Sequence, residues 1–253
     1  MAKADYFDKY KNLAFSRDDG VLTLRFHTNG GPIVFTGQTH DDLPQALEEV
    51  ALDPGNKAMV ITGTGDSFMD KIDGPSLGEI FKPAAWEKTR SEGTKVLQRL
   101  LDLPMPVVGV ANGPATVHSE YLLLSDIHIA SERAVYGDYP HPAFAITGGD
   151  GVQVVWEEVA GSARAKWLLW TGETIDAQTA LDWGVVGEVV AHDRALERGL
   201  EIASSLAAKP ALYRSLHKQT LNVNMRRRIT QDVPYGMALE GLTAADQPYQ
   251  RQG

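Results

Sequence analysis

His141 and Asp150 lie in a segment whose other residues are mainly apolar, proline or glycine, YPHPAFAITGGDG at 139–151. An imidazole takes up and releases protons near neutral pH, so His141 is a candidate general base for a water molecule. A carboxylate on the second ring nitrogen would fix the tautomer and stabilise the cation, which is the role predicted for Asp150. The adjacent glycines allow the turn that this pairing needs. The alternative is a packed loop histidine and an aspartate that caps the next helix.

The composition is that of an ordinary soluble globular chain. The 253 residues are 43% hydrophobic and 23% charged, with a formal net charge of −9 and an isoelectric point of about 5.2. This acidity argues against nucleic acid or an anionic membrane as a partner. The absence of cysteine excludes disulfides, thiolate metal sites and a cysteine nucleophile. We expect no metal-ligand cluster, and the opening MAKADYFDKY lacks a signal-peptide core, so a cytoplasmic protein is expected.

Strands and helices are predicted to alternate in the first part of the chain. Two short apolar runs joined around Asp18-Asp19-Gly20 indicate a hairpin, at 12–15 and 21–26. Continuous apolar runs predict buried strands at 58–65, 106–113 and 126–130. Helical spacing predicts helices at 39–52, 84–102 and 119–124. The repeated order of strand, crossover and strand indicates βαβ units with right-handed connections.

The remainder of the chain is predicted to be mainly helical. The expected helices are at about 151–159, 161–171, 176–183, 192–207, 209–221 and 224–243, with a strand at 185–190. No low-complexity linker or internal repeat divides the sequence. The sequence therefore predicts an α/β core followed by a helical C-terminal part.

Four stretches occur in a recognisable order: AMVITGTGDSF at 58–68, PVVGVANGPA at 106–115, SDIHIAS at 125–131 and LWTGETIDAQTALDWGVVGEV at 169–189. Together they resemble the crotonase (enoyl-CoA hydratase/isomerase) superfamily over about residues 10–245. The resemblance implies an α/β crotonase fold, with a repeated ββα core at residues 1–190. Residues 191–253 would be a helical region that serves in trimerisation or as a lid. Homotrimers or dimers of trimers are expected.

The chain departs from the coenzyme A-dependent members of that family at their catalytic groups. Two backbone N–H groups form an oxyanion hole in crotonases, one after a Phe-x-Ala-Gly-x-Asp stretch and one in a glycine triplet. Here the first stretch is FMDKID at 68–73, and the residues after Asn112 read GPATVHS, without a triplet. The two hydratase glutamates fall at Tyr121 and near His141. Both hydratase acids are therefore missing.

One branch of the superfamily is more similar to this chain in NGPATVH at 112–118, YPHP at 139–142, GDGVQVVW at 149–156 and ALEGL at 238–242. These stretches resemble 6-oxocamphor hydrolase and related β-diketone hydrolases. The resemblance implies a retro-Claisen reaction, in which water cleaves the carbon–carbon bond between two carbonyls of a small cyclic or bicyclic diketone. It implies no coenzyme A and no other cofactor.

The functional positions of this branch carry over onto four residues of the expected type: His118, His141, Asp150 and Glu240. His118 would donate to a carbonyl oxygen, and Glu240 would orient or protonate groups near His141. A tryptophan that contacts a substrate carbonyl in the branch corresponds to Phe35, which has no N–H to donate. Phe35 and Leu77 are predicted to line the substrate site. The alternatives are a core histidine for His118 and a solvated helix residue for Glu240.

Other readings of the chain remain open at this stage. The same fold could carry a coenzyme A-dependent hydratase or isomerase, or a non-catalytic binding protein. His40 follows Thr39 at a predicted helix start, where a capping role is expected. His128 alternates with isoleucines in a predicted strand and is expected to be a packing or interface residue.

Overall fold

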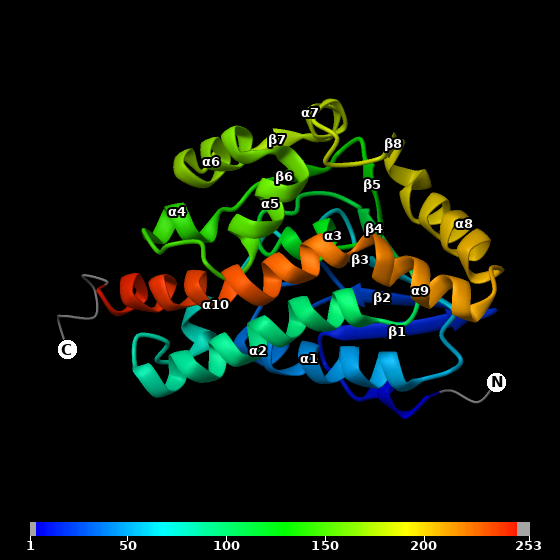
Figure 1. Ribbon diagram of the computed structural model, residues 1–253, viewed down its shortest axis with the longest axis horizontal. Coiled ribbons are helices and arrows are strands. Elements are labelled where there is room, and N and C mark those ends of the chain that lie inside the picture. The colour runs from blue at the N-terminus through cyan, green and yellow to red at the C-terminus, as the bar shows by residue number, and fades with distance from the viewer. Residues whose placement is uncertain (1–3, 247–253) are drawn as a thin grey trace.

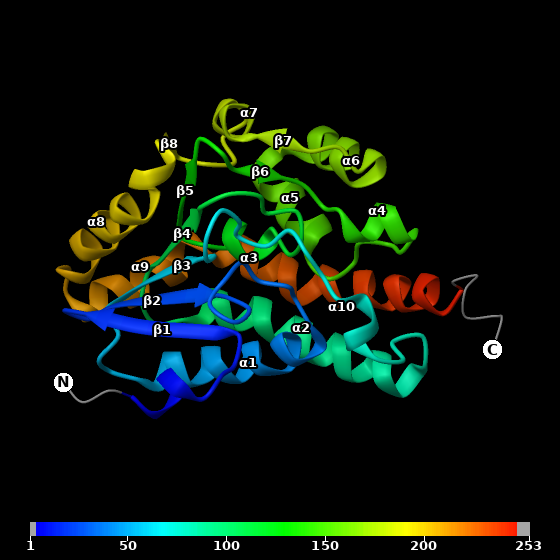
Figure 2. The same cartoon turned by 180° about the vertical axis from the view of Figure 1, so that it is seen from behind.

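A six-stranded sheet forms the centre of the computed structural model, which describes residues 4–246 (Figures 1 and 2). The strand order is β1-β2-β3-β4-β5-β8, with β1 and β2 antiparallel and each later pair of neighbours parallel. The bounds are β1 Leu13–Asp18, β2 Val21–Phe26, β3 Ala58–Thr62, β4 Val107–Ala111, β5 Ile127–Ser131 and β8 Glu188–Val190. Parallel neighbours need crossover connections, which the intervening helices supply.

The hairpin between β1 and β2 depends on two residues with positive backbone φ. Asp19 has a φ of 40° and Gly20 has a φ of 85°. Both central positions of a two-residue type I′ turn require positive φ. The hairpin predicted around these residues is therefore confirmed.

Helices lie on both sides of the sheet, and their order agrees with the predicted α/β organisation. Figures 1 and 2 place α8 on one side and α1 and α2 on the other, with α10 running beside α2. The bounds are α1 Gly37–Leu52, α2 Pro83–Asp102, α3 Glu120–Leu123, α4 Pro140–Phe144, α5 Val152–Ala160, α6 Ser162–Thr171, α7 Ala177–Asp182, α8 Ala195–Ala207, α9 Ala211–Leu221 and α10 Val223–Ala245.

Short elements complete the fold. The strands β6 Val135–Tyr136 and β7 Ile175–Asp176 pair antiparallel, apart from the main sheet. Within the described part of the chain, 3₁₀ helices span Asp5–Asp8, Gly74–Leu77 and His192–Arg194. Within residues 4–246, no helix is both long and apolar enough to cross a membrane.

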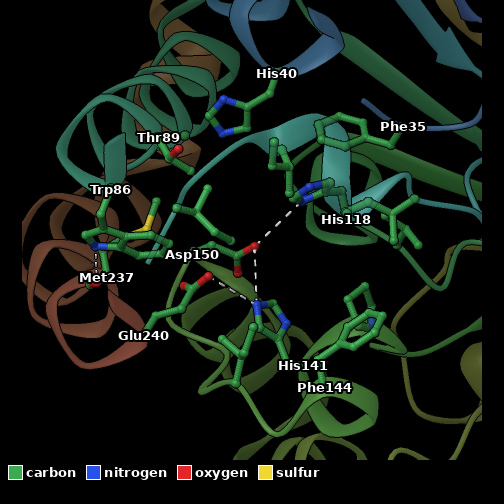
Figure 3. A pocket seen from close by; sticks show the side chains of 18 of the residues that line it. Phe35, His40, Trp86, Thr89, His118, His141, Phe144, Asp150, Met237 and Glu240 are labelled. Carbon is green, nitrogen blue, oxygen red and sulfur yellow. Dashed lines mark hydrogen bonds and ion pairs between the residues drawn. The ribbon is translucent and has the colours of Figure 1, made fainter. Parts of the chain in front are cut away.

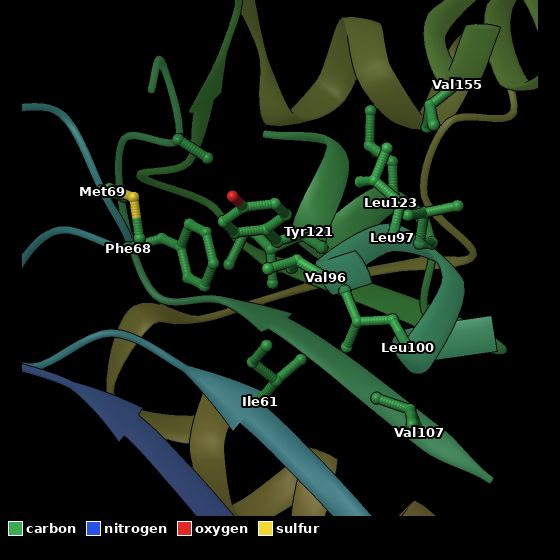
Figure 4. Packing of buried hydrophobic residues seen from close by; sticks show 14 of the residues in the cluster. Ile61, Phe68, Met69, Val96, Leu97, Leu100, Val107, Tyr121, Leu123 and Val155 are labelled. Atoms are coloured by element: carbon green, nitrogen blue, oxygen red, sulfur yellow. The ribbon is translucent and has the colours of Figure 1, made fainter. Parts of the chain in front are cut away.

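Alternate side chains of the central strands enter two separate cores. Val60 and Val110 point to one face and pack in a cluster with Ala203 of α8. Ile61 and Val107 belong to the larger cluster on the other face, which Figure 4 shows packed with side chains of α2 and α3. This two-sided burial explains why the strands read as continuous apolar runs.

His128 is a buried packing residue of β5, as expected. Its Nε2 lies 3.1 Å from the Tyr136 hydroxyl, and its Nδ1 has no partner among the described residues. Burial lowers the pKa of His128 to about 3. The folded state therefore holds this ring neutral, whereas the unfolded chain takes up a proton below its ordinary pKa of about 6.5.

We expect this difference to make the protein less stable as the pH falls from about 6.5 toward 3. Between pH 7 and 4.5 the free energy of unfolding should decrease by about 2–3 kcal/mol more in the wild type than in His128→Gln. The amide of glutamine can still bond Tyr136 but does not titrate. Urea unfolding of both proteins at the two pH values measures this, and equal decreases would contradict the assignment.

Candidate active site

A cavity of about 650 Å³ contains all six residues that the sequence assigns to the site. Figure 3 shows a mixed lining, with histidines and carboxylates at the centre and larger apolar side chains around them. The lining comes from the loop before α1, the 3₁₀ helix Gly74–Leu77, α2, α3, α4 and α10. The cavity therefore combines a polar centre with a mainly apolar wall, as small-molecule sites do.

His141 lies in the first turn of α4, between two prolines that restrict the backbone. The N–H of Tyr139 donates to the Thr116 carbonyl at 2.8 Å and ties this segment to the loop after β4. Nδ1 of His141 lies 2.8 and 2.9 Å from the two carboxylate oxygens of Asp138. Asp138, which lies just before α4, therefore fixes the tautomer and leaves Nε2 facing the cavity.

This geometry corrects the predicted pairing of His141 with Asp150. Asp150 Oδ2 lies 3.9 Å from His141 Nε2 and 3.6 Å from His118 Nδ1, so the carboxylate stands between the two imidazoles (Figure 3). Its Oδ1 accepts from the Val152 N–H at 3.3 Å at the start of α5. Asp150 thus has the expected helix-start contact and also faces the site. The predicted partner of His141 was wrong because Asp138, which is nearer in the chain, occupies Nδ1.

His118 has a left-handed backbone, with a φ of 47°. Such a conformation is uncommon outside glycine and often occurs at functional sites. Nδ1 lies 2.8 Å from Oε1 of Glu120, a carboxylate that is only 2% exposed. Burial alone lowers the pKa of His118, but the charge and hydrogen bond of Glu120 outweigh it and raise the pKa.

The His118–Glu120 pair consequently retains an N–H donor. Burial raises the pKa of Glu120, so both members of the pair favour holding a proton between them. In the protonated form of His118, which its raised pKa favours, one ring N–H faces Glu120 and the second ring nitrogen carries a hydrogen of its own. His118 can therefore donate to an oxygen in the cavity.

Glu240 is a buried site residue of α10, and not a solvated helix residue. One carboxylate oxygen lies 3.5 Å from His141 Nε2, and the other accepts from the Gly149 N–H at 3.1 Å. A Cβ at Gly149 would lie 2.1 Å from the Gly236 carbonyl oxygen, so α10 can approach only because this residue is glycine. Burial raises the pKa of Glu240 to about 7, which leaves the carboxyl partly protonated near neutral pH.

Three neighbouring carboxyl groups, those of Asp138, Asp150 and Glu240, determine the pKa of His141. Burial lowers it, but the charge of Asp150 and the contacts to Asp138 and Glu240 outweigh burial and hold the pKa well above its ordinary value. His141 is thus a strong base whose unprotonated form becomes more abundant as the pH rises. A proton taken up at Nε2 would be stabilised by these carboxyl groups.

The segment before His118 is tied by backbone hydrogen bonds to the segment after β3. The N–H groups of Thr116 and Val117 both donate to the Met69 carbonyl, at 3.0 and 3.1 Å. Tyr121, at the position of the first hydratase glutamate, lines the cavity and stacks on the His118 ring at 4.8 Å with an interplanar angle of 4°. His118 and Tyr121 therefore form one continuous part of the cavity wall, on a segment that is anchored to Met69.

The apolar wall contains Phe35 and Leu77, as predicted. Phe35 is fully buried, and its ring lies 4.4 Å from that of His118. Further apolar side chains line the cavity: Ile80, Phe81, Trp86 and Phe144. The indole N–H of Trp86 donates to the Met237 carbonyl at 3.0 Å, so it is already occupied.

Sequence reasoning missed three residues of the site: Asp138, Glu120 and His40. His40 was expected to act at a helix start, but α1 begins earlier, and the side chain of Thr36 caps it. His40 instead lines the cavity, with Nδ1 3.3 Å from Glu92 Oε2. Its spacing from Leu43 places it on the buried face of α1, which is the signal that could have identified it.

Histidines and carboxylates gather in three groups whose ligand atoms lie within 4.8 Å of one another: His40, Asp41 and Glu92; His118, Glu120 and Asp150; and His141, Asp150 and Glu240. This corrects the expectation that no metal-ligand cluster is present. Their oxygen and nitrogen donors suit a divalent transition metal. In each group the histidine lies within 3.5 Å of a carboxylate oxygen, so these polar atoms already have partners within the protein.

Comparison with known proteins assigns the family. A family model described as enoyl-CoA hydratase/isomerase matches residues 17–243. The chain belongs to this family. The crotonyl-CoA hydratase of Syntrophomonas wolfei is 26% identical over 247 residues, covering 96% of this chain and 94% of that protein. The short-chain-enoyl-CoA hydratase of Clostridium acetobutylicum is 30% identical over 217 residues, covering 85% and 82%.

Solved structures confirm the crotonase fold and the branch that the sequence resembles. A β-diketone hydrolase from the cyanobacterium Anabaena sp. PCC 7120, bound to (S)-3-oxocyclohexyl acetic acid, is 43% identical with a TM-score of 0.95. The alignment covers 97% of this chain and 99% of that one. An enoyl-CoA hydratase/isomerase from Mycobacterium paratuberculosis is 24% identical with a TM-score of 0.87, covering 94% and 96%. This last likeness concerns the fold alone.

Proposed function

We propose that this crotonase-family protein hydrolyses the carbon–carbon bond between the two carbonyls of a cyclic or bicyclic β-diketone. The observation that carries the proposal is the polar centre of the cavity, where Asp150 stands between His118 and His141. The hydratase groups are replaced there by imidazoles that suit an attacking water and a developing oxyanion. The 43% identity to the cyanobacterial β-diketone hydrolase supports the same substrate class.

The proposed reaction begins when water adds to one carbonyl carbon. His141 Nε2 takes the proton of the water, and Asp138 holds the ring and stabilises its cation. His118 donates to the carbonyl oxygen that becomes the alkoxide. The alkoxide then re-forms a carbonyl as the carbon–carbon bond breaks, and the electron pair moves onto the second carbonyl as an enolate.

The last step returns a proton to the carbon of the enolate. The imidazolium of His141 is the proposed donor, since it carries the proton taken from water, and a carboxylate oxygen of Glu240 lies 3.5 Å from the nitrogen that holds it. The product is a keto acid that contains the diketone plus one water. Because the reaction consumes only the diketone and one water and forms no thioester, it calls for no coenzyme A.

The proposal is tested with a panel of cyclic and bicyclic 1,3-diketones, incubated with the protein and a metal chelator and analysed by mass spectrometry. A product one water heavier than its diketone supports the proposal. Binding of crotonyl-CoA without hydrolysis of any diketone would favour the hydratase branch. Failure of both would favour a non-catalytic binding protein.

Asp150→Asn should lower the single-turnover rate by about 10²–10³-fold, while the protein stays folded. The amide keeps the shape and the contact to Val152 but removes the negative charge between the two histidines. Rapid-quench measurement of keto acid formation gives the rate. The exposed Asp182→Asn, outside the cavity, is the control. A rate for Asp150→Asn within a few-fold of wild type would contradict the assigned role.

A further inference from the structure

The Tyr121 hydroxyl is an unused hydrogen-bonding group in the wall of the cavity. The residue is only 2% exposed, and within residues 4–246 no group is hydrogen-bonded to its hydroxyl, which is not among the fully buried atoms without a partner and is therefore open to the cavity that the residue lines. In Figure 4 the hydroxyl lies at the end of the ring turned away from Leu97 and Leu123. A hydroxyl that is open to the cavity and has no partner in the protein is free to bond a ligand.

The other buried tyrosines show the ordinary arrangement. Tyr6 donates to Asp53 at 3.1 Å, and Tyr10 donates to Glu49 at 2.6 Å. The Tyr136 hydroxyl lies 3.1 Å from a histidine nitrogen. None of these three lines the cavity. Among these four tyrosines, only Tyr121, which lines the cavity, has a hydroxyl without a partner among the described residues.

The surroundings of Tyr121 keep it a donor. Burial, together with the charges of Glu120 and Asp150, raises the pKa of the phenol well above its ordinary value. The hydroxyl therefore remains protonated throughout the neutral range and can donate to an oxygen. It cannot serve as the base that a hydratase glutamate provides at this position.

We infer that Tyr121 is a further catalytic residue, whose hydroxyl donates a hydrogen bond to the second carbonyl oxygen of the diketone and to the enolate oxygen formed from it. The inference rests on the proposed function. The Tyr121 and His118 rings stack with centroids 4.8 Å apart, so they offer two donors along one wall for a substrate with two neighbouring carbonyls.

Tyr121 can also replace the tryptophan N–H that contacts a substrate carbonyl in the related hydrolases and that Phe35 lacks. Phe35 packs against His118 and offers no N–H, and the indole N–H of Trp86 is bonded to a backbone carbonyl. A donor for the second carbonyl must then come from another residue. The unpartnered hydroxyl of Tyr121 supplies it.

The test compares Tyr121→Phe with wild type on whichever diketone the wild type hydrolyses. Loss of one donor to a developing oxyanion should lower kcat by about 10²–10³-fold, with a much smaller change in KM. Tyr10→Phe removes a buried hydroxyl outside the cavity and should leave both constants unchanged. The melting temperature of Tyr121→Phe should equal or exceed that of wild type, because no hydrogen bond within the protein is lost.

A spectroscopic measurement separates substrate contact from a structural role. In His141→Ala the bound diketone should stay intact, and its carbonyl stretching bands can be recorded by infrared difference spectroscopy. Adding Tyr121→Phe should shift one band to higher frequency, since a lost donor strengthens the carbonyl bond. An unshifted band, or a kcat for Tyr121→Phe within three-fold of wild type, overturns the inference and leaves the proposed function standing. Absence of any diketone hydrolysis by the wild type overturns both.

Discussion

His141→Ala is expected to lower the rate of diketone hydrolysis by about 10⁴-fold, the upper end of what general acid–base catalysis contributes. The large effect follows because one imidazole has two tasks, taking a proton from water and returning a proton to carbon. Its Nε2 is the ring nitrogen that faces Asp150 and Glu240, while Nδ1 is held by Asp138. Single-turnover measurement of keto acid formation, with substrate in excess of its dissociation constant, gives the effect.

Two further variants distinguish the loss of the base from damage to the fold. His141→Asn keeps an amide that can donate to Asp138, yet it offers no base, so it should be as slow as the alanine variant. His217→Ala removes an exposed histidine of α9 outside the cavity and should retain the wild-type rate. Diketone affinity should change little in any of the three. A near-wild-type rate for His141→Ala would remove this residue from the mechanism.

The main elements of the fold could be predicted because burial leaves a periodic pattern in the sequence. β3 and β4 are buried on both faces and read as continuous apolar runs, whereas α1 and α2 repeat apolar residues at helical spacing. The exceptions are short. The strands β6 and β7 have two residues each, and α4 has five residues with two prolines, too few to establish a period.

The site was predictable where a residue has no ordinary reason for its position. His118 and His141 interrupt apolar or glycine-rich segments, and Glu240 matched the resemblance although it lies in an otherwise unremarkable stretch of helix. Asp138 and Glu120 gave no such signal, because an acidic residue near a turn or a helix start is common on protein surfaces. Only the folded chain shows that both are buried and that each bonds an imidazole. Residue types and the resemblance therefore assigned Asp150 to the ring nitrogen that Asp138 occupies.

Asp138→Asn tests the hydrogen bond between Asp138 and His141 that the structure shows. The carboxylate accepts from Nδ1 at 2.8 Å and is only 5% exposed, so the ring depends on it for its tautomer. An asparagine can present its amide N–H to Nδ1 and so favour a hydrogen on Nε2, where the base must be unprotonated. Loss of tautomer control of this kind costs up to about 10⁴-fold in kcat.

The pH dependence of Asp138→Asn distinguishes this role from simple damage to the fold. In the wild type, kcat/KM should rise with pH through the raised pKa of His141, since the base form must be unprotonated. Removing the Asp138 charge takes away part of the stabilisation of the imidazolium, so the rising limb should move to lower pH while its plateau falls. Asp138→Glu, which restores a carboxylate, should move the limb back toward the wild-type position. A lower plateau with an unshifted limb in Asp138→Asn would mean that Asp138 shapes the loop without controlling the charge of His141.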